Sequence, residues 1–390
     1  MHSFRSSVFR ICCAAPLLVA STLCAAGADA NPWTDVWRGT LGDQKITACF
    51  NGSEYGAYYG SYYYERHRKP IQLSKEKQDA AWKESQPSAP TGIWTLSRPA
   101  GATLSGQWNK PGQANTLPLR LSRVPVADKD VAACASDAYN DALEAMPHIA
   151  VGAPQSFDGK RYRIQGVAVP GADGDALTLL RMELLESGPG IAAVNRELLQ
   201  ALPRTRAQMQ ESLFSCRRQA LGAFGEDGDF LGRLELKFWS ARWLSVAEYS
   251  NANCGGAHPS ASVAYLNWDL ASGKRVNLWN WIRNSKKTGG DGGEHWFDHA
   301  APDNLNAIIA GIARRQSAKG RPKDSDSCAD LYADNHEYQL SLRKAGLVFS
   351  TEFPHASQAC DEDVTLSLPQ LKPFLSKEGA AAMQSMLNAR

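Results

Sequence analysis

The chain has 390 residues, which is long for one compact domain and suits two. Hydrophobic residues make up 43% and charged residues 21%, so the composition supports packed cores and excludes a chain that is disordered throughout. The 42 Lys and Arg residues nearly balance the 40 Asp and Glu residues, so charge offers no argument for a nucleic acid or an anionic membrane as partner.

Residues 1–30 have the pattern of a cleavable secretory signal. Arg5 and Arg10 form a basic start, residues 11–26 are mostly apolar, and Ala28-Asp29-Ala30 fits the small-x-small cleavage rule. The apolar run is shorter than the roughly 20 residues that a spanning helix needs, which disfavours a membrane anchor. We expect a Sec-type signal cleaved before Asn31, a bacterial periplasmic or secreted location, and no membrane span in the mature chain.

The cysteines fit export to an oxidising compartment. Cys12, Cys13 and Cys24 leave with the signal, and lipidation at Cys24 is disfavoured because the bulky Leu23 precedes it. An even number remains, which predicts three disulfides among fifteen possible pairings. None of these cysteines forms a CxxC motif, so no zinc ribbon or redox motif is indicated. Proximity in sequence favours the pairs Cys49–Cys134, Cys216–Cys254 and Cys328–Cys360 without excluding the other pairings.

Residues 31–124 have an all-β pattern. Short runs rich in aromatic and β-branched residues alternate with Gly, Pro and Asn, and no stretch carries a long helical period. Turns are expected at Asn51-Gly52 and at Pro99-Ala100-Gly101. A small barrel or a curved meander is the natural arrangement, because closure removes exposed strand edges. The predicted strands cover residues 45–50, 57–66, 71–74, 92–97, 103–107 and 117–122.

A run of tyrosines at 58–64 is the most unusual local feature of this region. On a strand, Tyr58, Tyr62 and Tyr64 fall on one face and Tyr59 and Tyr63 on the other. One interpretation is an aromatic platform for sugars or peptides, with Tyr62 and Tyr64 as ligand contacts. The other is that one face fills the barrel while the opposite face packs across neighbouring strands.

Residues 125–159 have the composition of a connector. A helix is predicted over 137–146, and Pro147 and Pro154 punctuate the segment after it. Cys134 lies before this helix, where a bond to Cys49 would tie the connector to the barrel.

From residue 160 to 390 the pattern changes to mixed α and β. Strand runs and helix runs are partly segregated, which favours an α+β domain with an antiparallel sheet over a doubly wound fold. The chain carries no G-x-G-x-x-G motif and no P-loop. The predicted strands are 161–169, 177–185, 234–240, 243–252, 262–269, 338–342, 346–353 and 364–367, and the predicted helices are 190–202, part of 205–224, 303–315 and a terminal helix from 369.

Residues 243–282 carry the only family pattern that we recognise. A Gly-Gly-Ala-His turn occupies 255–258, a strand ends at Asp269-Leu270, a Ser-Gly-Lys turn follows at 272–274, and an aromatic segment closes the pattern at 278–282. This stretch resembles the extracellular domain of unknown function of the lysozyme-sensing anti-sigma factor RsiV, which also precedes the catalytic part of some peptidoglycan deacetylases. The closing segment departs from the family at its usually acidic position.

The resemblance covers about residues 160–378, because 193–195 and 338–375 also fit the family pattern. It leaves the N-terminal region unrecognised and brings no catalytic residues. It implies an envelope location and recognition of a cell-wall-associated protein, lysozyme-like in kind, or of a glycan.

Three residues of the second region are candidate ligand contacts. His258 leaves the Gly-Gly turn, and Trp279 and Trp281 would face the same way on an extended segment. Exposed tryptophans would form a binding patch for a sugar ring or a protein. The alternative is that both tryptophans belong to the core and that His258 is a hydrogen-bonded turn residue.

The best metal-like spacing is Glu294-His295-Trp296-Phe297-Asp298-His299. On a helix, His295 and His299 would share a face with Asp298 beside them, as zinc ligands require. A zincin needs Glu directly after the first His, and Trp296 stands there instead. The chain also lacks a G-x-S-x-G elbow.

These patterns predict a non-catalytic binding module of the cell envelope that needs no cofactor. The alternative is a metal-dependent hydrolase acting on envelope material, with His295, Asp298 and His299 as its ligands. The sequence predicts no nucleic-acid partner and does not indicate an oligomeric state.

Overall fold

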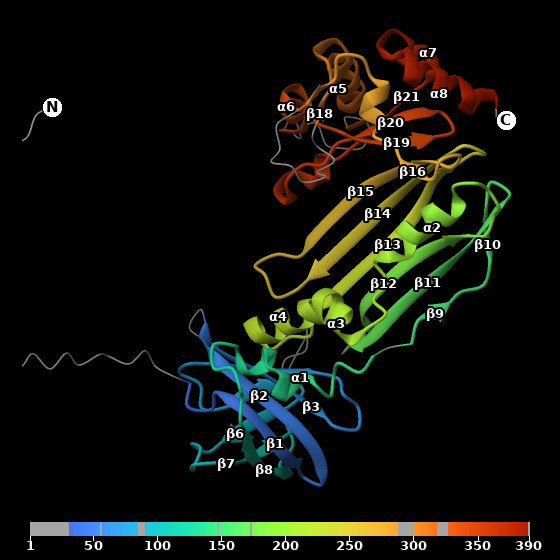
Figure 1. Ribbon diagram of the computed structural model, residues 1–390. Coiled ribbons are helices and arrows are strands. Elements are labelled where there is room, and N and C mark those ends of the chain that lie inside the picture. Colours follow the sequence, from blue (N-terminus) through green and yellow to red (C-terminus); the bar gives the residue numbers. More distant parts are fainter. Residues whose placement is uncertain are drawn as a thin grey trace, which may run out of the picture.

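The computed structural model describes residues 31–54, 57–84, 90–146, 148–171, 174–287, 299–317 and 327–388. A closed β-barrel stands at one end, a large sheet with helices occupies the middle, and a small sheet with further helices forms the other end (Figure 1). The chain passes through these three parts in sequence order. No helix within the described ranges is long and apolar enough to cross a membrane.

The barrel consists of eight antiparallel strands, and pairing of β1 with β8 closes it. This confirms the barrel interpretation over the open meander. Prediction missed β1, whose sequence mixes polar and apolar residues, and β5, which has three residues. The strands are β1 (Asp35–Leu41), β2 (Gln44–Glu54), β3 (Ala57–Tyr64), β4 (Ile71–Glu76), β5 (Trp82–Glu84), β6 (Ile93–Leu96), β7 (Thr103–Asn109) and β8 (Thr116–Val124).

The predicted turn at Asn51-Gly52 is wrong, because β2 continues through it. The register of β2 against β3 shifts there, so a bulge bends the strand where a turn was expected. The Asn51 side chain is buried and bonds two distant segments. Its Oδ1 accepts from the backbone N–H of Cys134 at 3.0 Å, and its Nδ2 donates to the carbonyl of Leu221 at 2.8 Å.

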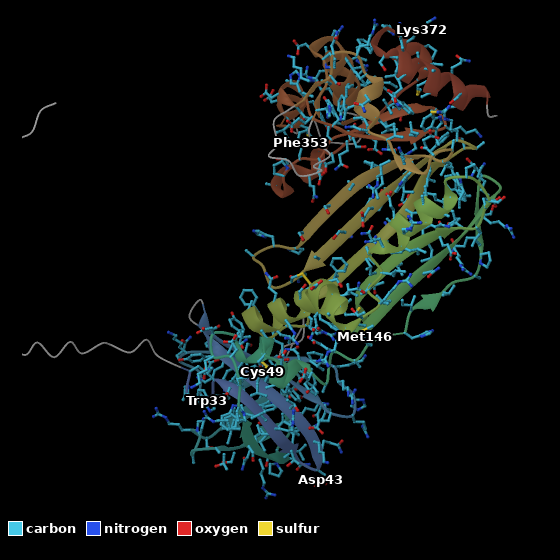
Figure 2. All side chains as sticks on the ribbon, viewed as in Figure 1. Trp33, Asp43, Cys49, Met146, Phe353 and Lys372 are labelled. Carbon is cyan, nitrogen blue, oxygen red and sulfur yellow. A yellow bond between two sulfur atoms is a disulfide. The ribbon has the colours of Figure 1, made fainter. Side chains whose placement is uncertain are left out.

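The connector covers the outer face of β2 and β3. Cys49 is bonded to Cys134, and the ring of Tyr63 packs on Tyr139 of α1 (Asp137–Asn140) with centroids 5.2 Å apart. Cys49 lies toward the end of the barrel nearest the large sheet, and Asp43 lies at the opposite end (Figure 2). The α1 helix is four residues long, so the predicted helix to residue 146 is wrong.

The large sheet has the order β10-β11-β12-β13-β14-β15-β16, with β9 beside β11. Its pairs are antiparallel with one exception, because β12 and β13 run parallel. The prediction of an antiparallel sheet is therefore wrong at this pair. The strands are β9 (Ala150–Val151), β10 (Gln155–Phe157), β11 (Lys160–Gly171), β12 (Gly174–Leu184), β13 (Asp229–Trp239), β14 (Trp243–Asn253), β15 (Ser260–Asp269) and β16 (Lys274–Arg275).

The parallel pair has a physical cause in the segment between its strands. Parallel neighbours need a crossover of a dozen or more residues, whereas a hairpin makes antiparallel ones. Three helices make this crossover: α2 (Ile191–Gln200), α3 (Arg206–Met209) and α4 (Ser215–Phe224). The α3 and α4 helices lie between the large sheet and the barrel (Figure 1).

The C-terminal part packs on the far end of the large sheet. Its three-stranded sheet is held to that sheet by buried side chains: Asn267 donates to the carbonyl of Leu340 at 3.1 Å, and Ser245 accepts from the backbone N–H of Leu342 at 3.2 Å. The elements are β17 (Lys286–Lys287), β18 (His299–Ala300), α5 (Asp303–Ser317), α6 (Ser327–Asp334), β19 (Gln339–Arg343), β20 (Gly346–Ser350), β21 (Asp363–Leu366), α7 (Leu368–Leu371) and α8 (Lys377–Asn388).

Disulfides lie in all three parts of the molecule. Besides Cys49–Cys134, the structure contains Cys216–Cys254, which joins α4 to the end of β14, and Cys328–Cys360, which closes the C-terminal part. These are the three pairs that proximity in sequence favoured. Cys49–Cys134 ties the barrel to the connector, and Cys216–Cys254 ties α4 to the large sheet.

A buried carboxylate joins the connector to α4, so that the barrel, the connector and the large sheet are linked in series. Glu144 of the connector is 1% exposed, and the guanidinium of Arg218 on α4 donates to both of its oxygens. Gln210 donates to Oε2 at 3.2 Å, and Arg206 lies 3.7 Å from the same oxygen. The carboxylate raises the pKa of Arg218 above its already high usual value, through its hydrogen bonds first and its charge after them. The guanidinium of Arg218 therefore stays protonated at any physiological pH.

We expect Glu144→Ala to lower the free energy of unfolding by about 3 kcal/mol, because it leaves the partly buried guanidinium of Arg218 with only the exposed Asp137 as its acceptor. Urea unfolding followed by circular dichroism measures this loss. Asp79→Ala, which breaks the exposed pair of Asp79 with Lys83, is the matched control and should stay close to the wild type. Equal stability of the two variants would show that Glu144 does not hold the connector to α4.

Candidate functional site

The predicted tyrosine platform lies mostly inside the barrel. Tyr62 is 2% exposed and Tyr58 is 7% exposed, while Tyr64 is half-buried and stacks edge-on with Tyr62 at 5.5 Å. On the opposite face, Tyr59 packs on Phe224 of α4 with centroids 5.3 Å apart. The interior face fills the barrel, as in the second interpretation of the run. The outer face packs on the connector and α4, not on neighbouring strands as that interpretation supposed.

Tyr62 reaches a carboxylate that the sequence does not single out. Glu84 at the end of β5 is 3% exposed, and its Oε1 accepts from the hydroxyl of Tyr62 at 2.7 Å, from Trp94 Nε1 at 2.9 Å and from Trp108 Nε1 at 2.7 Å. Its Oε2 accepts from the hydroxyl of Thr91 at 3.0 Å. In each of these contacts the neighbour donates and a carboxylate oxygen of Glu84 accepts.

The Glu84 carboxylate is closely packed against Gly92 and Trp108. A Cβ at Gly92 would lie 2.3 Å from Glu84 Oε2 and 2.2 Å from Trp108 Nε1, so only glycine fits there. Burial raises the pKa of Tyr62 far above its usual value of about 10, and the charge of Glu84 raises it further. The phenol therefore stays protonated and keeps donating. This cluster organises the barrel core.

The predicted tryptophan patch is buried in the core of the C-terminal part. Trp279 is 3% exposed and Trp281 is 0% exposed. Their segment is a 3-10 turn (Leu278–Trp281) begun by Asn277, whose Oδ1 accepts from the backbone N–H of Trp279 at 3.0 Å. In such a turn, residues two apart point about 120° from each other, so the extended geometry behind the prediction does not apply. The core alternative describes both residues, and they form no surface.

His258 is exposed on the turn between β14 and β15 and lies far from the two tryptophans. The ten residues of β15 separate them, a length of about 30 Å. The Gly-Gly turn itself has a structural cause. Gly255 has φ +82°, and a Cβ there would lie 2.7 Å from the Cα of Ala220 on α4. The turn is shaped by close packing on that helix, next to the Cys216–Cys254 bond.

The predicted metal ligands are only partly visible. His295 and Asp298 lie outside the described residues. His299 is 6% exposed, begins β18 and stacks on Trp279 with ring centroids 6.2 Å apart. Among the described residues, no group of three or more His, Cys, Asp or Glu side chains is arranged to hold a metal ion. The hydrolase hypothesis stays a prediction.

A cavity of about 730 Å³ lies where the large sheet meets the C-terminal part. The end of β13 and helix α8 supply its apolar wall, while the β10–β11 and β19–β20 turns supply charged side chains at its rim. Its lining residues are Asp158, Lys160, Phe238, Trp239, Ser240, Lys344, Ala345, Gly346, Ser367, Leu368, Pro369, Met383 and Met386.

The hydroxyls of this cavity have structural partners. Ser240 Oγ accepts from the backbone N–H groups of Trp243 at 2.9 Å and Arg242 at 3.2 Å, which closes the β13–β14 turn. Ser367 Oγ donates to Gln370 Oε1 at 2.6 Å at the start of α7. The described lining residues include no histidine and no cysteine. An apolar wall with a few charged groups at its rim suits the binding of a small ligand.

Sequence reasoning missed this cavity entirely. Asp158-Gly159 is a recognisable hairpin turn, with positive φ at both residues, and Lys160 follows it directly. Nothing in the sequence places that turn opposite Lys344, which lies 184 positions further along the chain. The only local sign of this cavity in the sequence is that Lys160 and Lys344 each lie at a tight turn.

No family model matches the chain, and no curated protein matches its sequence. Among solved structures, two proteins align with part of the chain. A DUF3298 family member from Bacteroides fragilis is 12% identical, covers 62% of this chain and 96% of its own, and has a TM-score of 0.38. A DUF3298 family protein from Pseudomonas aeruginosa is also 12% identical, covers 60% of this chain and 97% of its own, and has a TM-score of 0.35. DUF3298 is a domain of unknown function, and this likeness assigns no ligand.

We expect Glu84→Ala to lower the free energy of unfolding by about 3 kcal/mol, because three donors lose their shared acceptor and two of them are fully buried. Glu84→Gln keeps an acceptor oxygen at the same place and should cost clearly less. Urea unfolding followed by tryptophan fluorescence compares the variants, with the exposed Glu65→Ala as control. If Gln and Ala were equally damaging, charge and not acceptor geometry would hold the cluster.

Proposed function

We propose that this protein is a non-catalytic binding module of an oxidising compartment outside the cytoplasm, and that the 730 Å³ cavity holds an anionic ligand with an apolar portion. The observation that carries the proposal is the composition of the cavity wall. Strand β13 and helix α8 provide an apolar surface. The charged lining residues are two lysines, Lys160 and Lys344, and one acid, Asp158, so positive charge predominates.

The size of the cavity supports a small ligand or one end of a larger one. Small-molecule sites usually enclose about 300–1,000 Å³, are mostly apolar and carry a few polar groups that fix orientation. Phe238, Met383 and Met386 give this wall its apolar character, and methionine side chains adapt to irregular shapes. Lys160 and Lys344 lie at tight turns at the rim, where their ammonium groups can reach the carboxylate end of a ligand whose apolar portion lies on the wall.

The envelope setting rests on separate support. Three disulfides favour an oxidising compartment, and residues 1–30 have the pattern of a secretory signal. The resemblance of residues 160–378 to the RsiV-type domain supports recognition at the cell wall. Peptidoglycan fits the cavity chemistry, because its stem peptides end in carboxylates beside apolar alanine side chains.

We expect dodecanoate to bind more tightly than dodecanol, which has the same apolar chain without the charge. Lys160→Gln combined with Lys344→Gln should weaken dodecanoate binding about tenfold, since two partly exposed ion pairs together contribute about 1.4 kcal/mol. Isothermal titration calorimetry measures both ligands. Lys110→Gln on the barrel is the matched control. Equal affinities for the acid and the alcohol would contradict the charged part of the proposal.

Purified peptidoglycan should retain the mature, oxidised protein from residue 31 onward, and Met386→Trp should reduce that retention by filling the cavity. Immobilised lysozyme is the comparison bait. Retention on either bait that Met386→Trp leaves unchanged would place recognition on another surface. Zinc analysis of the same sample tests the hydrolase hypothesis: stoichiometric zinc that disappears in His295→Ala would count against a non-catalytic role.

A further inference from the structure

A second, smaller pocket of about 360 Å³ lies between helix α2 and strands β13 to β15. Its residues differ completely from those of the first cavity. Two arginines and two glutamates line it, together with Trp268 and a floor of leucines. The charged residues are Arg181, Glu197, Glu248 and Arg275, and the leucines are Leu198, Leu234 and Leu266.

Arg181 on β12 is the unusual member. It is 7% exposed, and its Nη2 pairs with Glu248 Oε1 at 2.7 Å. Its other two nitrogens, Nε and Nη1, are buried and have no hydrogen-bond partner among the described residues. The N–H groups of buried guanidinium groups normally have hydrogen-bond acceptors, because a buried donor without an acceptor loses its hydrogen bonds to water and gains none in return. The Arg181 side chain is therefore prepared for acceptor atoms that this chain does not supply.

The opposite wall of the pocket is already ordered. Glu197 Oε2 accepts from Trp268 Nε1 at 3.0 Å and from Arg275 Nε at 2.7 Å. The guanidinium of Arg275 lies flat over the Trp268 ring, 4.8 Å from its centroid. Planar groups locked in this way form a rigid wall, which reduces the entropy cost of binding against it.

Charge balance selects the class of ligand. Two arginines face two glutamates, so the pocket is neutral as it stands. An anion would add an uncompensated negative charge to a partly buried site, and a cation would face Arg181. A neutral ligand rich in hydroxyl groups can accept from the guanidinium and donate to the carboxylates without changing that balance.

We propose that this pocket binds a neutral saccharide ring. As the side chain stands, Nε and Nη1 of Arg181 are closed off from solvent, so binding turns the guanidinium toward the pocket. Hydroxyl oxygens then accept from these two nitrogens, hydroxyl groups donate to Glu248 and Glu197, and the C–H face of the ring lies on the leucine floor. A volume of about 360 Å³, near the lower end for small-molecule sites, suits one or two sugar rings. This site is additional to the anion cavity and does not depend on it.

The test uses N-acetylglucosamine and glucose as neutral probes and glucuronate as the anionic counterpart. Proton–nitrogen NMR spectra of the full mature protein follow the Arg181 Nε–H signal, which is assigned by its loss in Arg181→Lys. A neutral sugar should shift this signal saturably, and glucuronate should bind more weakly. Arg181→Lys, which keeps the charge and loses the planar donor array, should weaken sugar affinity about tenfold by calorimetry.

Two further variants protect this test from a folding artefact. Arg163→Lys alters an Arg–Glu pair of the same sheet outside the pocket and should leave sugar affinity unchanged. Gln200→Trp adds bulk at the exposed lip of the pocket and should block binding while Arg181 stays in place. The proposal is overturned if no neutral sugar shifts the signal, if glucuronate or phosphate binds in preference, or if Gln200→Trp has no effect.

Discussion

Strands β12 and β13 pair in parallel, and their pairing shapes the rest of the molecule. The pairing spans Leu177–Leu179 against Phe230–Gly232 and obliges the chain to cross between the two strands through helices. One of these helices, α2, lies on the sheet and walls the Arg181 pocket. Another, α4, carries Cys216 and Arg218, which tie it to the large sheet and to the connector. The same crossover therefore forms one wall of a pocket and the surface on which the barrel packs.

Buried polar side chains join the three parts alongside shared apolar clusters. Asn51 bonds the barrel to the connector and to α4, and Asn267 and Ser245 bond the large sheet to β19. Glu144 and Glu84 are both buried, yet they differ in partners. Glu144 faces arginines, whereas Glu84 faces only neutral donors among the contacts described for it. Such groups stabilise one arrangement strongly because any other would leave them unsatisfied.

The two hollows have contrasting chemistry, which is why they suit different ligands. The cavity beside α8 lies at the meeting of two separately packed cores and has an apolar wall with lysines at the rim. The pocket beside α2 holds balanced charges around an arginine with unsatisfied nitrogens. The proposed anion site and the proposed neutral-sugar site together would fit a composite polymer better than a single small metabolite.

The sequence by itself determined that residues 31–124 are all β, and it determined most strand positions and the mixed α and β character of residues 160–390, whereas closure of the barrel was decided by the pairing of β1 with β8. These follow from short-range periodicity, which a strand or helix expresses locally. It also favoured the three disulfide pairs that the structure contains. It did not reveal the parallel pair, because the direction of a strand depends on the path of the whole crossover. The sequence also did not reveal that Trp279 and Trp281 are buried, since the residues that cover them come from α8, β18 and β20. Both hollows were decided by tertiary structure alone. Lys160 and Lys344 line one cavity, and Arg181 pairs with Glu248, only after segments distant in sequence have packed together. No local sequence pattern encodes which surfaces will pack.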